Sequence, residues 1–144
     1  MLGLITTSTI NPCLSDYFVN LTGITQQYVD VDGISLAESL ARFTAFAEPE
    51  LLLCSWGNDY RIMDDNCKLR GLEQLGMDAR VVDLRGLFAA AGVPTEEYTS
   101  GSVHYSFDVD DIVGDLHNAV FDVRSMLAGL SQLGRTGADF RQWL

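Results

Sequence analysis

The stretch His117-Asn118-Ala119-Val120-Phe121-Asp122 decides the fold of this 144-residue chain. It stands at the head of an amphipathic helix that we expect from about Asn118 to Leu133, because apolar residues recur there at helical spacing. This spacing puts the His117 imidazole in the loop before the helix and the Asp122 carboxylate in the first turns, so both can face one cleft. A carboxylate can bind a hard divalent cation and a histidine can take a proton from water. A solvated helix start, with Asp122 favoured by the helix dipole, fits the same spacing.

Upstream of this helix, short apolar segments alternate with helical patterns. The run Leu51-Leu52-Leu53-Cys54 and the segment 80–84 are each typical of a short buried strand. Further helices are expected over residues 35–48, 62–75 and 87–91, with Ser35 as an N-cap and Gly76 as a terminator. Residues 7–33 read as loop with short helical turns, and residues 95–111 as irregular. The pattern predicts an α/β domain, although two strands are few for so many helices.

The segment Ser55-Trp56-Gly57-Asn58-Asp59 follows the first expected strand. Open α/β sheets build ligand sites at the carboxyl ends of their strands, so Asp59 is well placed to be a second metal ligand. The alternative is that Asp59 caps the helix that begins near Tyr60, which is the commoner role of an aspartate in this position.

Four segments together resemble the DEDDh 3′-to-5′ exonucleases, in order and in approximate spacing, and most of all the RNase T and Eri-type branch. The segments are residues 21–25, 54–59, 82–84 and 116–122, the last followed by Arg124. The resemblance covers roughly residues 8–133. It implies a ribonuclease H-like α/β fold, two divalent cations (Mg²⁺ or Mn²⁺), and hydrolysis of phosphodiesters at the 3′ ends of single-stranded DNA or RNA.

The same resemblance assigns roles to individual residues. It makes Asp59 the third and Asp122 the fourth metal-binding carboxylate of the family, and His117 the general base for the attacking water. The residues that would bind the 3′-terminal nucleotide are Thr22, Gly23, Ile24, Trp56 and Asn118. A tight turn with flanking core residues explains the segment 21–24 equally well.

Two departures from the family pattern bear on activity. Relatives in this branch show Trp-Gly-x-x-Asp, which would put the carboxylate at position 60, where this chain has Tyr60. The strand with Asp-x-Glu that opens the family's domain has no counterpart upstream of Leu21. We therefore expect residues 1–133 to be an N-terminally truncated exonuclease-like domain that lacks the first strands of the sheet, and residues 134–144 to be a tail.

The missing carboxylate pair leaves two functional hypotheses open. A site with only Asp59 and Asp122 would bind a hard cation weakly, so activity would need a partner subunit or further acidic residues. The alternative is a catalytically inactive exonuclease-like module for binding or assembly. In both cases a homo-oligomer or partner subunit is expected to cover the apolar faces left by the absent strands.

Composition limits the kinds of partner and location. Twenty acidic residues against nine basic ones give a formal net charge of −11, which repels nucleic acid in bulk. No basic stripe is visible, but bound divalent cations would invert the sign of an acidic cleft. The three cysteines show no paired spacing, and neither a signal peptide nor an apolar run of ~18 residues is present, so we expect a cytoplasmic protein.

Three other candidates carry less weight. The acidic group Asp108, Asp110 and Asp111 lacks the glycine and glutamate of a calcium-binding EF-hand loop, so a solvated loop is favoured. His104 has no obvious partner set and is expected to have a surface or packing role. Ser55 is not within the Gly-x-Ser-x-Gly turn of a serine hydrolase.

Overall fold

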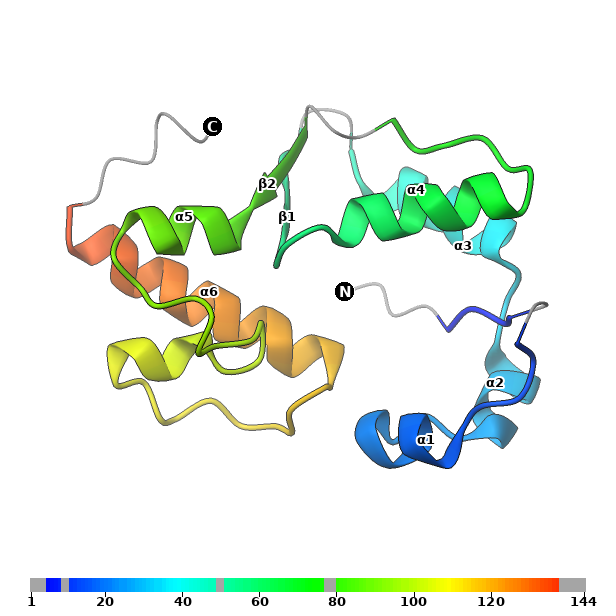
Figure 1. The fold of residues 1–144 in the computed structure, drawn as a ribbon, viewed down its shortest axis with the longest axis horizontal. Helices are drawn as coiled ribbons and strands as arrows, with labels where there is room; N and C mark the ends of the chain where they lie inside the picture. Colours follow the sequence, from blue (N-terminus) through cyan, green and yellow to red (C-terminus); the bar gives the residue numbers. More distant parts are fainter. Residues whose placement is uncertain (1–4, 9–10, 49–50, 77–79, 138–144) are drawn as a thin grey trace. The chain divides into compact units, whose positions relative to one another are not determined.

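The computed structural model describes residues 5–8, 11–48, 51–76 and 80–137 (Figure 1). The chain divides into two compact units, the first formed by residues 1–51 and 64–75 and the second by residues 52–63 and 76–144. Helix α4 (Asp59–Leu69) begins in the second unit and ends in the first. Within the described residues, no helix is long and apolar enough to cross a membrane.

The first unit is helical. Its helices are α1 (Asp16–Thr22), α2 (Gln26–Asp32) and α3 (Leu36–Phe46). Each begins after a serine or threonine whose side chain accepts a hydrogen bond from a backbone N–H three residues on, which satisfies one of the free donors of the first turn. The N-cap predicted at Ser35 is confirmed. The turn-rich stretch 7–33 contains two complete short helices.

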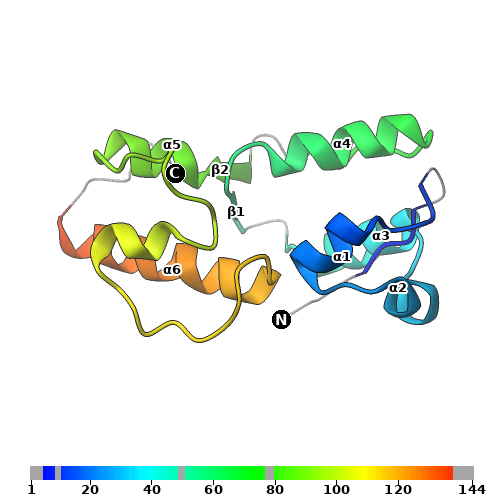
Figure 2. The same ribbon diagram turned by 60° about the horizontal axis from the view of Figure 1, so that its bottom comes forward.

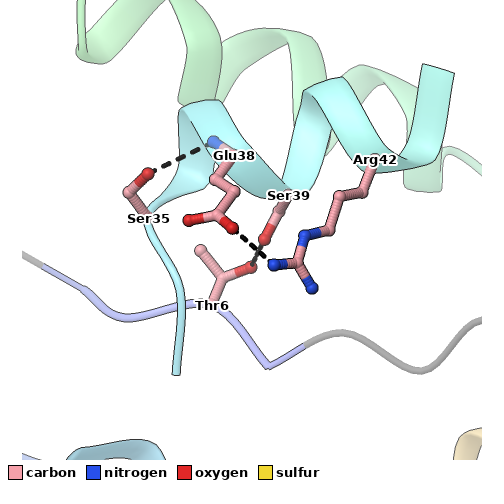
Figure 3. A network of polar contacts seen from close by, with 5 residues as sticks. All are labelled: Thr6, Ser35, Glu38, Ser39 and Arg42. Atoms are coloured by element: carbon pink, nitrogen blue, oxygen red, sulfur yellow. Dashed lines mark hydrogen bonds and ion pairs between the residues drawn. The ribbon is translucent and has the colours of Figure 1, made fainter. Parts of the chain in front are cut away.

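A polar network joins the start of α3 to the segment 5–8 (Figure 3). The Ser35 hydroxyl accepts the Glu38 N–H at 3.2 Å, and the Glu38 carboxylate pairs with the Arg42 guanidinium one turn later. The buried Ser39 hydroxyl lies 2.8 Å from that of Thr6. The hydroxyl pair therefore ties α3 to the segment 5–8, whereas the exposed ion pair adds little stability.

The second unit contains a short parallel sheet (Figures 1 and 2). Strand β1 (Leu53–Ser55) pairs with strand β2 (Val81–Asp83) in the register Leu53 to Val81, Cys54 to Val82 and Ser55 to Asp83. These two strands make up the whole sheet in the part of the chain that the structure describes. The predicted α/β class and the small sheet are confirmed.

The core of the second unit is built around Phe88, in helix α5 (Leu84–Ala90), which is fully buried. Its ring centroid lies 5.7 Å from that of Trp56 and 6.0 Å from that of Phe107. Phe107 ends the 3₁₀ helix η2 (Val103–Phe107), which packs against helix α6 (Ala119–Arg135). At Gly129 in α6, a Cβ would lie 3.0 Å from the Phe88 ring, so the glycine allows α6 to approach α5 closely.

The predicted boundary of the second helix at Gly76 is wrong, because α4 ends at Leu69. Gly71 adopts the left-handed conformation, with φ of +63°, and its N–H donates to the Lys68 carbonyl at 3.1 Å. The Leu72 N–H donates to the Cys67 carbonyl, as in a helix end closed by glycine. Apolar residues continue at helical spacing beyond Leu69, so the prediction from periodicity placed the end of the helix too late.

Other boundaries shift by a few residues. Helix α5 begins at Leu84 rather than at 87, because the Asp83 carboxylate caps it by accepting the Arg85 N–H. The stretch 95–111, expected to be irregular, contains η2. Helix α6 continues to Arg135, two residues beyond its predicted end. Of the predicted tail, residues 138–144 lie outside the described residues.

Candidate functional site

The turn that follows β1 is fixed to the end of β2. Asp83 Oδ1 accepts hydrogen bonds from the Gly57 N–H at 2.8 Å and from the Arg85 N–H at 2.9 Å. The Ser55 hydroxyl donates to the Gly57 carbonyl at 2.9 Å, and Gly57 has a φ of +84°, which favours glycine. One carboxylate therefore holds the carboxyl ends of both strands. Sequence reasoning missed this role of Asp83, although an aspartate directly before a helix is the usual signal of a cap.

Asp59 lies at the first position of α4, at this same edge of the sheet. Partial burial raises the pKa of Asp59, a hydrogen bond from the Trp56 backbone lowers it, and the charge of Asp83 raises it further, with a net upward direction. A cavity of about 260 Å³ lies at the same edge, lined by Gly57, Asn58, Asp83, Arg85, Gly86, Ala89 and Thr95.

The head of α6 presents His117 and Asp122 in different surroundings. His117 is exposed and has a φ of +65°, a left-handed conformation that is uncommon outside glycine. Asn118 is the N-cap, and its side-chain oxygen accepts the N–H groups of Val120 and Phe121. Asp122 is half-buried in the first turn, where its Oδ2 accepts a hydrogen bond from the Ser100 hydroxyl at 3.2 Å.

Three of the residues predicted to bind substrate form the end of α1, in the first unit. Gly23 closes the helix in the left-handed conformation, with its N–H donating to the Val19 carbonyl at 2.8 Å. The Thr22 hydroxyl donates to the Phe18 carbonyl and accepts the Ile24 N–H. These contacts explain Thr22 and Gly23 as a helix end. Their role toward a nucleotide stays a prediction.

Trp56 and Asn118, the other two predicted substrate residues, have structural contacts of their own. Trp56 packs its ring against the core, and Asn118 caps α6. Both belong to the second unit, as do Asp59, His117 and Asp122. Their predicted roles in binding and catalysis remain untested by these contacts.

The fit of a divalent-metal centre can be judged from the oxygen donors present. Asp122 Oδ1 is a carboxylate oxygen that accepts no hydrogen bond from the described residues, although it is buried beside Gly101. However, the described residues contain no group of three or more histidine, cysteine, aspartate or glutamate side chains that could hold a metal. The described residues therefore do not form the two-metal centre that the family resemblance implies.

His104 belongs to η2 and is buried against α6, with 1% of its surface exposed. Its Nδ1 is 2.8 Å from the hydroxyl of the fully buried Ser125, and its ring meets Phe121 edge-on with 5.7 Å between centroids. Burial lowers the pKa of His104, and the charge of Asp110 opposes this shift. The packing role expected for His104 thus includes a buried polar contact with Ser125. No pattern in the sequence indicated Ser125 as its partner.

This burial predicts that stability falls in acid. Because the folded protein holds the pKa of His104 below that of a free imidazole, about 6.5, the unfolded chain takes up the proton first as the pH falls. The stabilisation is present above that pH and is lost below it. We expect the urea midpoint of the parent protein to fall between pH 7 and pH 5 (roughly the range in which histidine titrates), and His104→Asn to show a weaker fall.

His117→Asn removes the other histidine of the sequence and is the matched control for this measurement. A pH dependence that disappears in the control and persists in His104→Asn would contradict the assignment to His104.

Comparison with solved structures identifies the fold. The nuclease domain of 3′hExo, a DEDDh family member, bound to rAMP is similar over 92% of this chain and 70% of that one, with a TM-score of 0.77 and 20% identity. A 3′-exonuclease that recognises the histone mRNA stem-loop at its 3′ end has a TM-score of 0.78 at 20% identity, with 48% of that chain covered. A full-length 3′-exonuclease has a TM-score of 0.74 at 21% identity, with 46% covered.

No protein-family model and no curated protein matches the sequence. The structural similarity shows that the chain has the α/β fold of DEDDh nuclease domains, and it confirms the predicted resemblance at the level of the fold.

Proposed function

We propose that this protein is a DEDDh-type 3′-to-5′ exonuclease domain that hydrolyses phosphodiesters at the 3′ ends of single-stranded RNA or DNA with Mg²⁺ or Mn²⁺. The observation that carries the proposal is the head of α6, in a chain with the fold of DEDDh nuclease domains. There His117 stands exposed just before the N-cap, and Asp122 follows in the first turn with one carboxylate oxygen free of hydrogen bonds from the described residues. An exposed imidazole can accept a proton from water as a general base.

The proposed roles follow this arrangement. His117 accepts the proton of the attacking water, while Asp59 and Asp122 supply carboxylates for cation binding. Since the described residues do not complete a two-metal centre, further carboxylates must come from elsewhere in the protein or from a partner. The nucleotide would be bound by Thr22, Gly23, Ile24, Trp56 and Asn118.

A second candidate function is a catalytically inactive module that binds nucleic-acid ends or assembles with another protein. The incomplete metal centre in the described part of the chain favours it, and the net charge of −11 favours assembly with another protein over binding of nucleic acid. An acidic protein without bound cations repels a phosphate backbone. This candidate therefore predicts a defined complex with no change in the length of the nucleic acid.

The test uses the whole chain and one labelled single strand in two forms, linear with a free 3′ hydroxyl and covalently closed as a circle. An exonuclease shortens the linear form stepwise in Mn²⁺, leaves the circle intact, and stops when EDTA is added. Separate RNA and DNA strands identify the substrate class. Cutting of the circle would contradict the proposal, because a 3′-end enzyme has no site of attack there.

An intact linear strand at every protein concentration would also contradict exonuclease activity for the isolated chain. The binding module is then tested by fluorescence anisotropy on the same two strands, together with light scattering. Tighter binding of the linear form, or a defined oligomer, supports the module, whereas a monomer that binds neither strand excludes it.

A further inference from the structure

Strand β2 passes directly into α5 (Figure 1), and the cavity of about 260 Å³ lies at this junction. Its polar side chains come from three segments of the second unit, namely Asn58 after β1, Asp83 and Arg85 at the junction, and Thr95 after α5. None of the residues proposed for catalysis lines this cavity. Because open parallel sheets bind ligands at the carboxyl ends of their strands, the cavity is a candidate ligand site apart from the head of α6.

Thr95 is the buried polar side chain of this cavity, with 7% of its surface exposed. Its hydroxyl makes no hydrogen bond with any residue that the structure describes. A buried hydroxyl without a partner lowers stability, and native structures contain few of them. A polar ligand in the cavity would supply the missing partner.

The Arg85 guanidinium, also on the cavity wall, makes no ion pair or hydrogen bond within the described residues. Asp83 lies two residues earlier, and its Oδ1 accepts the backbone N–H groups of Gly57 and Arg85. Asp83 Oδ2 accepts no hydrogen bond from the described part of the chain. The cavity therefore offers one cationic group and one carboxylate oxygen to a ligand.

The charges around the cavity decide which class of ligand uses both groups. Burial raises the pKa of Asp59 and the charge of Asp83 raises it further, so the two carboxylates lie close enough to repel each other. Two carboxylates on this side disfavour a phosphate and favour an ammonium group. A simple cation, however, would leave Arg85 without a partner. A ligand with one anionic and one cationic group satisfies both sides.

The size of the cavity limits the ligand further. Water occupies about 30 Å³ per molecule in the liquid, so the cavity has room for roughly nine waters, or for a molecule with about as many non-hydrogen atoms. This size suits a free amino acid better than a nucleotide. The Thr95 hydroxyl and the Asn58 amide would then be available to bind a polar side chain of the ligand.

We propose that this cavity binds a small free α-amino acid with a polar, uncharged side chain. Arg85 binds the ligand carboxylate through its planar fork of N–H donors, Asp83 Oδ2 accepts from the ammonium group, and Thr95 bonds the ligand side chain. The site goes beyond the proposed function, because it uses none of the catalytic residues. Its test is therefore independent of whether the chain hydrolyses nucleic acid.

The test titrates L-serine into the whole chain by isothermal titration calorimetry. Ethanolamine lacks the carboxylate of serine and 3-hydroxypropanoate lacks its ammonium group, so each keeps one half of the charge pattern. L-serine should bind at one site, and each half should bind about tenfold more weakly or worse, since a hydrogen bond to a charged group contributes that much. No binding of L-serine would overturn the proposal. Equal binding of 3-hydroxypropanoate or inorganic phosphate would also overturn it, because the cavity would then be an anion site.

Two variants connect the binding to the cavity. Arg85→Ala should weaken binding of L-serine about tenfold or more, whereas Arg61→Ala, an exposed arginine of α4 outside the cavity, changes the net charge equally and should leave binding unchanged. Equal effects of the two substitutions would overturn the proposal.

Thr95→Val removes the hydroxyl and keeps the shape of the side chain. Because this hydroxyl has no partner among the described residues, the thermal midpoint of the free protein should stay the same or rise. Binding of L-serine should nevertheless weaken about fivefold, the effect of one neutral hydrogen bond. A lower midpoint with unchanged binding would show that Thr95 serves only the fold, which contradicts its place in the site.

Discussion

Replacement of His117 by asparagine is expected to reduce turnover of 3′ ends by about 100- to 10,000-fold, which is the usual contribution of a general base. His117 is exposed, so its side chain can be removed without opening the core. Asparagine suits this position because it tolerates the left-handed conformation that His117 adopts, with a φ of +65°. The measurement is the rate of shortening of the linear strand in Mn²⁺, with the thermal midpoint recorded alongside.

A loss of activity with an unchanged thermal midpoint assigns the effect to the imidazole. His117→Gly provides the control for this assignment, because glycine adopts positive φ freely and leaves space for added imidazole. Recovery of activity by free imidazole would identify the missing group as a base. Turnover of His117→Asn at the parent rate would instead favour the inactive binding module, with any observed activity coming from another source.

The head of α6 was predictable because its signals are local. Asn118 caps the helix through its own side chain, and the apolar spacing after it persists for four turns. The positions of His117 and Asp122 relative to the helix start follow from the same spacing. Ser35 was found at the start of α3 for the same reason, since a cap bonds only three residues away. Local chemistry of this kind can be read directly from a sequence.

The partners of these residues could not be predicted, because they come from distant parts of the chain. Ser100 lies 22 positions before Asp122, and Ser125 lies 21 positions after His104. Serines are common and follow no periodic pattern in a sequence. Only the packing of η2 on α6 brings these two hydroxyls into contact with their partners. Asp83 is similar, since its bond to Gly57 spans 26 positions and depends on the register of β1 with β2.

The fold class was predictable, whereas the composition of the candidate site was predictable only in part. Alternating strand and helix patterns are sufficient to indicate an α/β domain. A metal centre, however, depends on several carboxylates meeting in space. In the described residues, Asp59 has Asp83 as its acidic neighbour, while Asp122 faces Ser100 and Gly101. The family pattern named two of the carboxylates but did not supply the rest of the site.

Replacement of Phe88 by alanine is expected to destabilise the second unit by about 3–5 kcal/mol, the usual cost of removing a buried phenylalanine. Phe88 is fully buried, and its ring contacts Trp56 from the turn after β1 and Phe107 from η2. Gly129 leaves no side chain on α6 to fill the space, because its missing Cβ is what admits the ring. The cavity should therefore remain open, which places the cost toward the upper end of the range. Urea unfolding followed by tryptophan fluorescence measures it.

The matched control is Phe46→Ala, which makes the same chemical change at a side chain that is 56% exposed in the first unit. It should alter stability by no more than about 0.5 kcal/mol, as surface substitutions usually do. Because Trp56 packs on Phe88, its fluorescence reports the second unit, and Phe88→Ala should shift the transition seen by this probe. A Phe88→Ala protein as stable as Phe46→Ala would contradict a core centred on Phe88. Destabilisation of the second unit should also lower 3′-end turnover, since the same core supports α6 and the turn that carries Ser100.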